Sequence, residues 1–315
     1  MPETSSEHRR RPILVTGAHR SGTTWVGKML AASREVGYIS EPLNVHHRPG
    51  VMRVPVERWY TYICADNQAH YLPALEDTIG FRYQLPAELA ALRSIKDLMR
   101  MGRDWATFTR GRLRGQRPLL KDPFAVFSAA WFVQALDCAL VIVVRHPAAF
   151  ASSLMRLGWP FDVTDLLLQP LLLRDHLEPY RGQLEKISQT PQDVIAQSAL
   201  LWNMIYQFVD QLRVRCPQTI LVRHEDLSEQ PVRGFRELYA AIGLSFTSRV
   251  EGQIRKASAS GNPQELSRDA VHSVRLDSRA NLKSWQRRIS QADIERLRRL
   301  TAGVAERFYQ ERDWP

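Results

Sequence analysis

A glycine-bounded turn near the amino terminus has the residue types of a phosphate-binding loop. Residues 13–16 predict a short buried strand, and the apolar spacing after Gly22 predicts a helix. The first turn of a helix has backbone N–H groups without internal partners and a positive dipole end, so it is suited to a phosphate. The spacing from Gly17 to Gly22 is that of a P-loop, but Thr23 replaces the usual Lys. Because that Lys contacts the β- and γ-phosphates of a nucleoside triphosphate, the sequence favours a nucleotide without a triphosphate tail.

Three segments resemble the signature segments of sulfotransferases, which use 3′-phosphoadenosine 5′-phosphosulfate (PAPS). Residues 19–25, HRSGTTW, are similar to the family's 5′-phosphosulfate loop. Residues 139–156 resemble its 3′-phosphate loop, in which a strand leads to an Arg-x-Pro turn and a helix with a Ser; here Arg145 and Ser153 stand eight positions apart. Residues 278–290 resemble its carboxyl-terminal segment with basic residues and Trp. From these three segments, in the family's order, the chain is identified as a member of the PAPS-dependent sulfotransferase family, bacterial or carbohydrate type.

The resemblance implies which residues bind PAPS as co-substrate. The hydroxyls and amides of the first loop would hold the 5′-phosphate, and Trp25 packs either near the nucleotide or in the core. Arg145 and Ser153 would bind the 3′-phosphate, which the planar guanidinium fork recognises in a bidentate manner. The carboxyl-terminal segment would close over the nucleotide, although the Arg-Lys-Gly run of cytosolic members is absent. The expected binding residues are His19, Arg20, Ser21, Gly22, Thr23, Thr24, Trp25, Arg145, Ser153, Arg279, Lys283 and Trp285.

Three charged residues are expected to carry the chemistry. Sulfuryl transfer is an in-line displacement at sulfur, and Arg20 would stabilise the negative charge that builds on the leaving oxygen. Glu41, in YISEPLN, would take the proton of the attacking hydroxyl or amine. Several bacterial and carbohydrate sulfotransferases have a Glu base in this region, whereas the cytosolic steroid and phenol type uses a His, which is the alternative base. Lys121 would contact the sulfonyl oxygens or the acceptor, and Asp122 is expected to cap the helix that Pro123 begins.

An α/β fold would position these residues. Besides residues 13–16, the runs 118–121, 139–145 and 219–223 predict strands, and each lies between segments of helical spacing. Strands that alternate with helices form parallel sheets through crossover connections. Ligands of such sheets bind beyond the carboxyl ends of the strands, where the first loop, Lys121 and the Arg-x-Pro turn all fall. The prediction is therefore a P-loop-like parallel β-sheet flanked by helices.

The rest of the chain is expected to surround this sheet. Residues 87–114 and 191–215 predict long helices, and residues 157–190, which contain three prolines, predict a helical cap or insertion. Residues 1–11 predict a flexible basic amino terminus. Because no strong boundary is visible, residues 1–315 are expected to form a single sulfotransferase domain.

Composition restricts the partners and the compartment. The net charge of +10 and the pI of about 9.8 favour anionic partners, but no groove-reading module supports nucleic acid. No apolar run is long enough to cross a bilayer, and the amino terminus has no apolar signal core. The three distant cysteines argue against a disulfide framework and have no metal-ligand spacing, so a cytoplasmic protein without a metal is expected.

Two other functions remain as alternatives. A P-loop kinase or other NTPase is disfavoured by Thr23 in place of Lys and by Arg145 where a magnesium-holding Asp would stand. A non-catalytic nucleotide- or polyanion-binding protein is disfavoured by the presence of Arg20, Glu41 and Lys121 together. The sulfotransferase acceptor is expected to be a carbohydrate, a glycolipid or a small metabolite.

Overall fold

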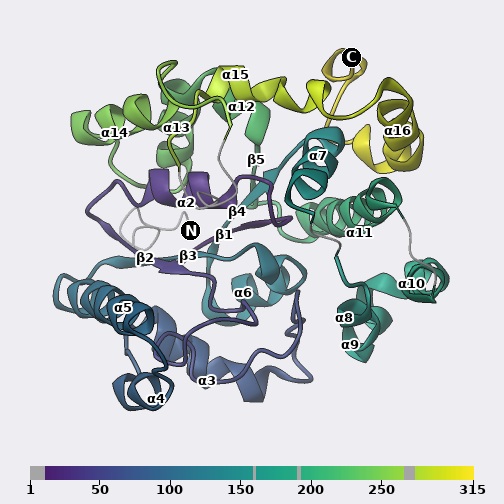
Figure 1. The fold of residues 1–315 in the computed structure, drawn as a ribbon. Helices are drawn as coiled ribbons and strands as arrows, with labels where there is room; N and C mark the ends of the chain where they lie inside the picture. Colours follow the sequence, from purple (N-terminus) through teal and green to yellow (C-terminus); the bar gives the residue numbers. More distant parts are fainter. Residues whose placement is uncertain (1–10, 159–160, 190–192, 266–273) are drawn as a thin grey trace.

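A parallel sheet of five strands forms the centre of the computed structural model, which describes residues 11–158, 161–189, 193–265 and 274–315 (Figure 1). The strands lie in the order β2-β3-β1-β4-β5, and every neighbouring pair is parallel. Parallel neighbours require crossover connections, which the helices between the strands supply. The predicted α/β fold is therefore confirmed. The strands are β1 (Ile13–Gly17), β2 (Val36–Ser40), β3 (Arg117–Lys121), β4 (Ala139–Val144) and β5 (Ile220–Arg223).

The sheet separates two apolar cores because side chains alternate between the faces of a strand. Along β1, Ile13 and Val15 join one core and Leu14 joins the other. Figure 1 shows α2, α13 and α14 above the sheet and α3 and α6 below it. Burial on both faces explains why β1 and β4 are continuous apolar runs. The bounds of these helices are α2 (Thr23–Leu30), α3 (Gln68–Ile79), α6 (Ala129–Leu136), α13 (Pro231–Ala241) and α14 (Ser248–Ser258).

Further helices pack at the ends and edges of the sheet. Ahead of β3 lie α4 (Leu85–Ala90) and α5 (Ile95–Leu113), and the short helix η1 (Pro123–Ser128) follows that strand. The helices α7 (Pro147–Leu157) and α11 (Val194–Arg215) pack against each other. The carboxyl-terminal half adds α12 (His224–Glu229), α15 (Ser278–Leu282), η5 (Ser284–Arg287), α16 (Gln291–Ala305) and η6 (Glu311–Asp313).

The segment predicted as a cap consists of short helices over residues 161–189. Leu166, Leu172 and Leu177 from this segment are buried in the same core as Leu14. Residues 159–160 and 190, and the basic residues 1–10, lie outside the described residues. The helices are α8 (Thr164–Leu167), α9 (Pro170–Leu172), the π-helical turn η2 (Leu173–Leu177), the 3₁₀ turn η3 (Glu178–Tyr180) and α10 (Arg181–Gln189).

Two elements differ from the sequence-based expectation. Strand β2 was not predicted, because its five residues contain Gly37 and follow directly on the turn after α2. The long helix expected over 87–114 is interrupted, and α5 begins anew after Ser94, whose hydroxyl accepts a hydrogen bond from Asp97 N. An N-cap of this kind satisfies a first-turn N–H group that would otherwise have no partner.

None of the helices in the described ranges is long and apolar enough to cross a membrane.

Gly17 ends β1 in a conformation that requires glycine. Its φ is +141°, and a Cβ atom there would collide with the carbonyl oxygen of Val143 in β4. We therefore expect Gly17→Ala to lower the free energy of unfolding by about 1–3 kcal/mol, measured by urea denaturation. Gly303→Ala is the matched control, because Gly303 lies in α16 with open space around it and should gain stability. A Gly17→Ala variant as stable as the parent would contradict this account.

Candidate active site

The loop between β1 and α2 is shaped to bind an anion. Arg20 and Gly22 have positive φ values of 67° and 102°, and a Cβ atom on Gly22 would collide with the His224 ring. Helix α2 begins at Thr23, and its N-cap residue Gly22 contributes no side-chain hydrogen bond. No acidic residue occupies the first turn. The first-turn N–H groups of α2 therefore remain available to an anion at the positive end of the helix.

Helix α11 holds this loop against the sheet. The hydroxyl of Tyr206 donates to Val143 O over 3.0 Å and accepts from Ala18 N over 3.4 Å. Trp202, one turn away on the same helix, donates from Nε1 to Arg145 O over 2.9 Å. Both aromatic side chains are fully buried, so they link the two predicted phosphate loops to one rigid helix.

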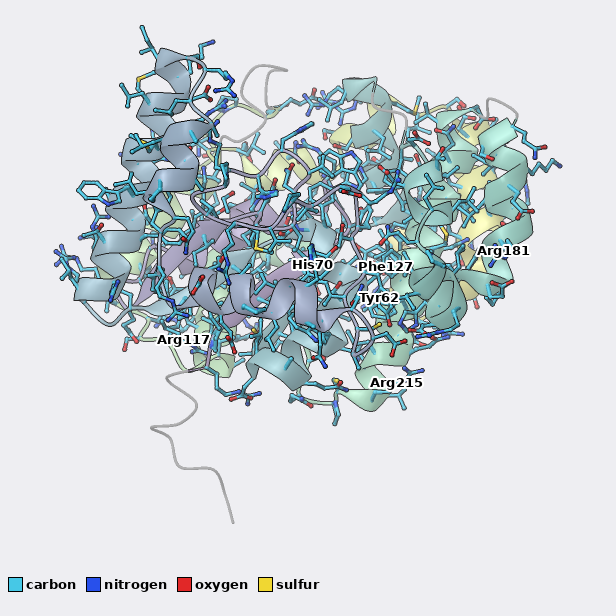
Figure 2. All side chains as sticks on the ribbon, turned by 90° about the horizontal axis from the view of Figure 1, so that it is seen from below. Tyr62, His70, Arg117, Phe127, Arg181 and Arg215 are labelled. Atoms are coloured by element: carbon cyan, nitrogen blue, oxygen red, sulfur yellow. The ribbon has the colours of Figure 1, made fainter. Side chains whose placement is uncertain are left out.

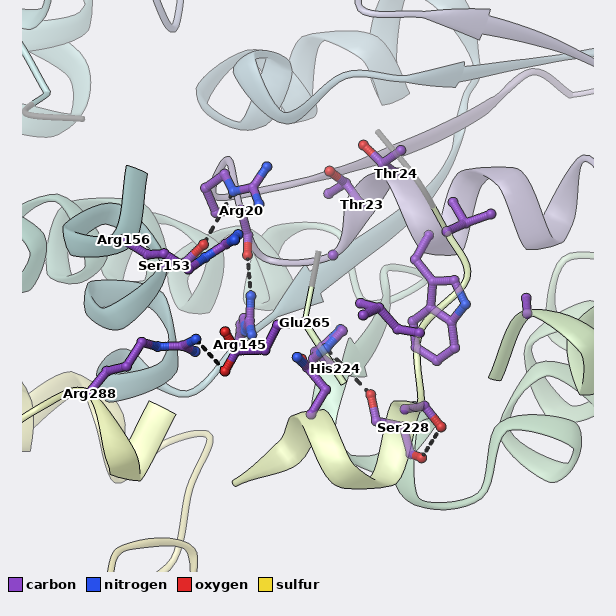
Figure 3. Close-up of a pocket in the computed structure, with 17 residues that line it drawn as sticks. Arg20, Thr23, Thr24, Arg145, Ser153, Arg156, His224, Ser228, Glu265 and Arg288 are labelled. Carbon is purple, nitrogen blue, oxygen red and sulfur yellow. Dashed lines mark hydrogen bonds and ion pairs between the residues drawn. The ribbon is translucent and has the colours of Figure 1, made fainter. Parts of the chain in front are cut away.

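The two predicted phosphate loops meet in one pocket (Figure 3). Arg145 Nη1 donates to the backbone oxygen of Arg20 over 2.9 Å, and Arg20 Nε donates to Ser153 Oγ over 3.3 Å. Within the described part of the chain, Arg145 Nε is buried without a hydrogen-bond partner. The predicted residues that line the pocket are Arg20, Gly22, Thr23, Thr24, Trp25, Arg145 and Ser153.

The pocket concentrates positive charge. Burial, together with the charges of Arg145 and Arg156, lowers the pKa of Arg20 to about 10. Burial also lowers the pKa of Arg145, while the nearby Glu225 carboxylate opposes that shift. Glu225 is held in turn by hydrogen bonds of 3.0 Å from His146 N and from the Tyr309 hydroxyl. Lowered pKa values of guanidinium groups mean that their charges are incompletely compensated, so an anionic ligand would stabilise this arrangement.

Glu41 and Lys121 form an ion pair at the carboxyl end of the sheet. Lys121 Nζ donates to Glu41 Oε1, and Asn44 Nδ2 donates to Glu41 Oε2 over 2.6 Å. Glu41 follows β2 directly, has a φ of 50°, and donates its backbone N–H to Lys121 O over 2.8 Å. Its charge also acts on Arg20, raising the pKa of that guanidinium against the effect of burial. Glu41 and Lys121 are therefore in direct contact, at the edge of the sheet where the loop of Arg20 also follows its strand, although neither Glu41 nor Lys121 lines the pocket of Arg145.

Asp122 has the capping role that the sequence predicts. It is fully buried, and its carboxylate accepts hydrogen bonds from Phe124 N over 2.9 Å and Leu43 N over 2.6 Å. Burial and the charge of Glu41 raise the pKa of Asp122 to about 7. With both carboxylate oxygens bound to backbone N–H groups, Asp122 fixes the turn after Glu41 onto the end of β3.

Several expected binding residues lie outside the pocket lining. His19 is buried among aromatic rings, 2.6 Å from the Tyr60 hydroxyl, and burial lowers its pKa to about 3, so the ring is neutral at pH 7. Trp285 is buried and stacks on the His146 ring at 5.3 Å between centroids. Arg279 donates to Glu229 O over 3.0 Å. The complete set of expected residues outside the lining is His19, Ser21, Arg279, Lys283 and Trp285.

Two arginines that sequence reasoning missed line the pocket instead. Arg156 stands three positions after Ser153 on α7, so helical spacing alone places it on the same face. Arg288 donates from Nε to Ser152 Oγ over 2.9 Å and pairs with Glu265 over 2.7 Å. The position of Arg288 depends on how η5 packs against α7, and no local sequence pattern predicts that contact.

Comparisons with known proteins identify the family to which this chain belongs. The model of the sulfotransferase family matches residues 12–248. Mouse carbohydrate sulfotransferase 3 is 27% identical over 176 residues, which are 54% of this chain and 31% of that protein. Mouse carbohydrate sulfotransferase 5 is 31% identical over 84 residues, 27% of this chain and 21% of that protein. The matches thus span less than a third of these relatives.

A structural match that spans most of this chain is to sulfotransferase STF9 from Mycobacterium avium. It is 15% identical, with a TM-score of 0.48, and the match covers 96% of this chain and 78% of that one. The family match extends from β1 to the start of α14 and includes both predicted phosphate loops, Glu41 and Lys121. The chain belongs to the sulfotransferase family.

Proposed function

We propose that this protein transfers the sulfuryl group of PAPS to a hydroxyl or amine acceptor. The observation that carries the proposal is that the two predicted phosphate loops meet in one pocket, which four arginines line. A nucleotide with a 5′-phosphosulfate and a 3′-phosphate has anionic groups at both ends, which two separate cationic loops suit. The four arginines are Arg20, Arg145, Arg156 and Arg288.

The residues present fit such a nucleotide. The open first turn of α2 and the Thr23 and Thr24 side chains would hold the 5′-phosphate. The buried Arg145 Nε, which lacks a partner among the described residues, would donate to the 3′-phosphate together with the Ser153 hydroxyl. Trp25 packs edge-on against His224 and Phe235 and also lines the pocket, so it would form a wall of the nucleotide site.

The chemical step uses the side chains at the ends of β1, β2 and β3. The acceptor oxygen or nitrogen attacks sulfur, its proton passes to the Glu41 carboxylate, and the electron pair of the broken S–O bond stays on the 5′-phosphate oxygen. Arg20 would neutralise the charge that develops on that oxygen, and Lys121 would bind the sulfonyl oxygens. These contacts strengthen as charge develops, which is the condition for lowering the barrier rather than only binding the substrate.

The acceptor is proposed to be a carbohydrate, with a glycolipid or a small metabolite as alternatives. The names of the two mouse relatives favour a carbohydrate. Trp59 is half-buried, contacts His46 edge-on and packs at a tilt against Phe124, the second residue of η1, shortly after Lys121. An aromatic ring at this position suits the apolar face of a sugar. A cytoplasmic location is proposed because all three cysteines, Cys64, Cys138 and Cys216, are unpaired.

Radiolabelled PAPS tests this proposal. The protein is incubated with PAPS labelled in its sulfuryl group and with a panel of glycans, glycolipids and metabolites, and labelled products are separated from the nucleotide. The proposal expects label on at least one acceptor class and stoichiometric release of adenosine 3′,5′-bisphosphate. Transfer of phosphate from ATP to the same panel, with no transfer from PAPS, would favour a kinase instead.

Transfer is expected to need no divalent metal. The sulfuryl group carries less negative charge than a phosphoryl group, and the cations of Arg20 and Lys121 would be enough to neutralise it. Among the described residues, no group of three His, Cys, Asp or Glu side chains is placed to hold a metal ion. Turnover measured with excess chelator should therefore equal turnover with added magnesium. Loss of transfer with chelator and recovery with magnesium would contradict the proposed step.

A further inference from the structure

The outer face of α5 is apolar although it faces solvent. Ile95 is 79% exposed, Met99 is 64% exposed and Leu98 is 51% exposed, and Trp105 and Leu113 are also exposed. Residues 95, 98, 99, 102 and 105 follow helical spacing, so they share one face. Figure 2 shows this helix at the side of the molecule, with its upper end extending beyond the sheet and the other helices. An exposed, contiguous apolar stripe of this kind is typical of a surface that binds another protein or a membrane.

A basic flank accompanies the apolar stripe. On the helical wheel of α5, continued to its C-cap residue Arg114, five cations lie beside the stripe and between it and the buried face. The buried face contacts the protein through Phe108 and Gly111, and Asp97 pairs with Arg48 over 2.9 Å. Among the described residues, Lys96, Arg110 and Arg114 have no ion-pair partner. The flank consists of Lys96, Arg100, Arg103, Arg110 and Arg114.

We propose that α5 docks the protein on an anionic lipid bilayer, with its apolar stripe in the interface and its basic flank against the headgroups. Helices that lie in a membrane interface combine an apolar face that carries Leu and Trp with Lys and Arg beside it. Charge complementarity thus favours an anionic lipid surface over a second copy of this chain, whose α5 would carry the same positive flank.

The docked helix would bring one edge of the sheet close to the bilayer. Helix α5 packs against β2, which ends next to Glu41. Burial lowers the pKa of Lys28, and the charges of Lys121 and Arg103 lower it further. Because α5 packs against β2, the helix that carries the flank lies beside the edge of the sheet at which Glu41 follows β2. The docking does not depend on the proposed sulfuryl transfer and is tested without it.

Vesicle sedimentation tests the docking on the full-length protein. We expect binding to vesicles of phosphatidylcholine with phosphatidylglycerol, weaker binding at high salt, and little binding to phosphatidylcholine alone. Each Lys or Arg near an anionic surface contributes about fivefold, so Lys96→Gln with Arg110→Gln should weaken binding ~25-fold. Replacing the three exposed residues by Ile95→Gln, Leu98→Gln and Met99→Gln should weaken it on the order of 100-fold.

Val214→Gln is the matched control. Val214 is 82% exposed on α11 between Arg213 and Arg215, so it combines an isolated apolar side chain with neighbouring cations. This variant should bind vesicles like the parent, and all variants should melt at the same temperature by circular dichroism. No binding of the parent to anionic vesicles, or an equal loss in Val214→Gln, would overturn the proposal. So would sedimentation velocity in which the triple variant converts a dimer of the parent into monomers, because α5 would then be a self-association surface.

Discussion

Glu41→Gln should reduce turnover by about 10²–10⁴ with little change in nucleotide affinity. The substitution keeps the shape of the side chain and its hydrogen bond with Asn44, but it removes the basic carboxylate. Nucleotide affinity should persist because Glu41 lies outside the pocket that Arg145 and Ser153 line. Steady-state kinetics and calorimetry with adenosine 3′,5′-bisphosphate measure the two quantities separately.

Two further variants make this result specific. Glu76→Gln changes an exposed carboxylate on α3 and should leave turnover unchanged. Lys121→Met removes the cation that pairs with Glu41, so it should lower turnover while the shape of the side chain is largely kept. Near-normal turnover of Glu41→Gln on the true acceptor would remove Glu41 from the mechanism. His46 and His47, which lie shortly after it in the sequence, would then be the candidates for the base.

Arg145→Ala should weaken the binding of adenosine 3′,5′-bisphosphate by about 30- to 150-fold and leave the binding of AMP nearly unchanged. Losing a charge-assisted phosphate contact costs roughly 2–3 kcal/mol, and only the bisphosphate carries the 3′-phosphate. Calorimetric titration of both nucleotides into both proteins measures the effect. Equal weakening of the two nucleotides would indicate that the variant disturbs the loop at Arg20, whose backbone oxygen Arg145 binds, rather than a 3′-phosphate contact.

Arg279→Ala is the informative control for that experiment. The sequence places Arg279 in the predicted binding segment, but in the structure it donates to Glu229 O and does not line the pocket. Its replacement should therefore leave bisphosphate affinity unchanged. Arg145→Lys should fall between the parent and Arg145→Ala, because an ammonium group keeps the charge but lacks the planar donor fork.

Local sequence patterns predicted the parts of the candidate site that directly follow a strand in the sequence. Strand β1, its glycine turn and α2 follow each other in sequence, so residue types alone located the loop from Arg20 to Thr24. The carboxyl ends of parallel strands share one edge, which explains why Lys121 and the Arg-x-Pro turn were also placed correctly. Strand β2 was missed because five residues around Gly37 give a weak pattern, and its presence is what brings Glu41 to that edge.

Contacts between segments far apart in the sequence could not be predicted from local sequence patterns. Basic residues and Trp in residues 278–290 suggested Arg279, Lys283 and Trp285, yet Arg288 from this segment lines the pocket. Which of these side chains faces inward depends on the docking of η5 on α7 and on the stacking of Trp285 on His146. His19 shows the same effect, since the Tyr60 hydroxyl and the neighbouring aromatic rings hold it in the core.

Nucleotide selectivity tests the central claim most directly. Calorimetry compares adenosine 3′,5′-bisphosphate in the presence of chelator with ATP in the presence of magnesium. The account predicts much tighter binding of the bisphosphate, because one loop has Thr23 where a P-loop has Lys and the other places Arg145 and Ser153 in the same pocket. Tight binding of ATP with magnesium, together with weak binding of the bisphosphate, would contradict it and favour a nucleoside triphosphate enzyme.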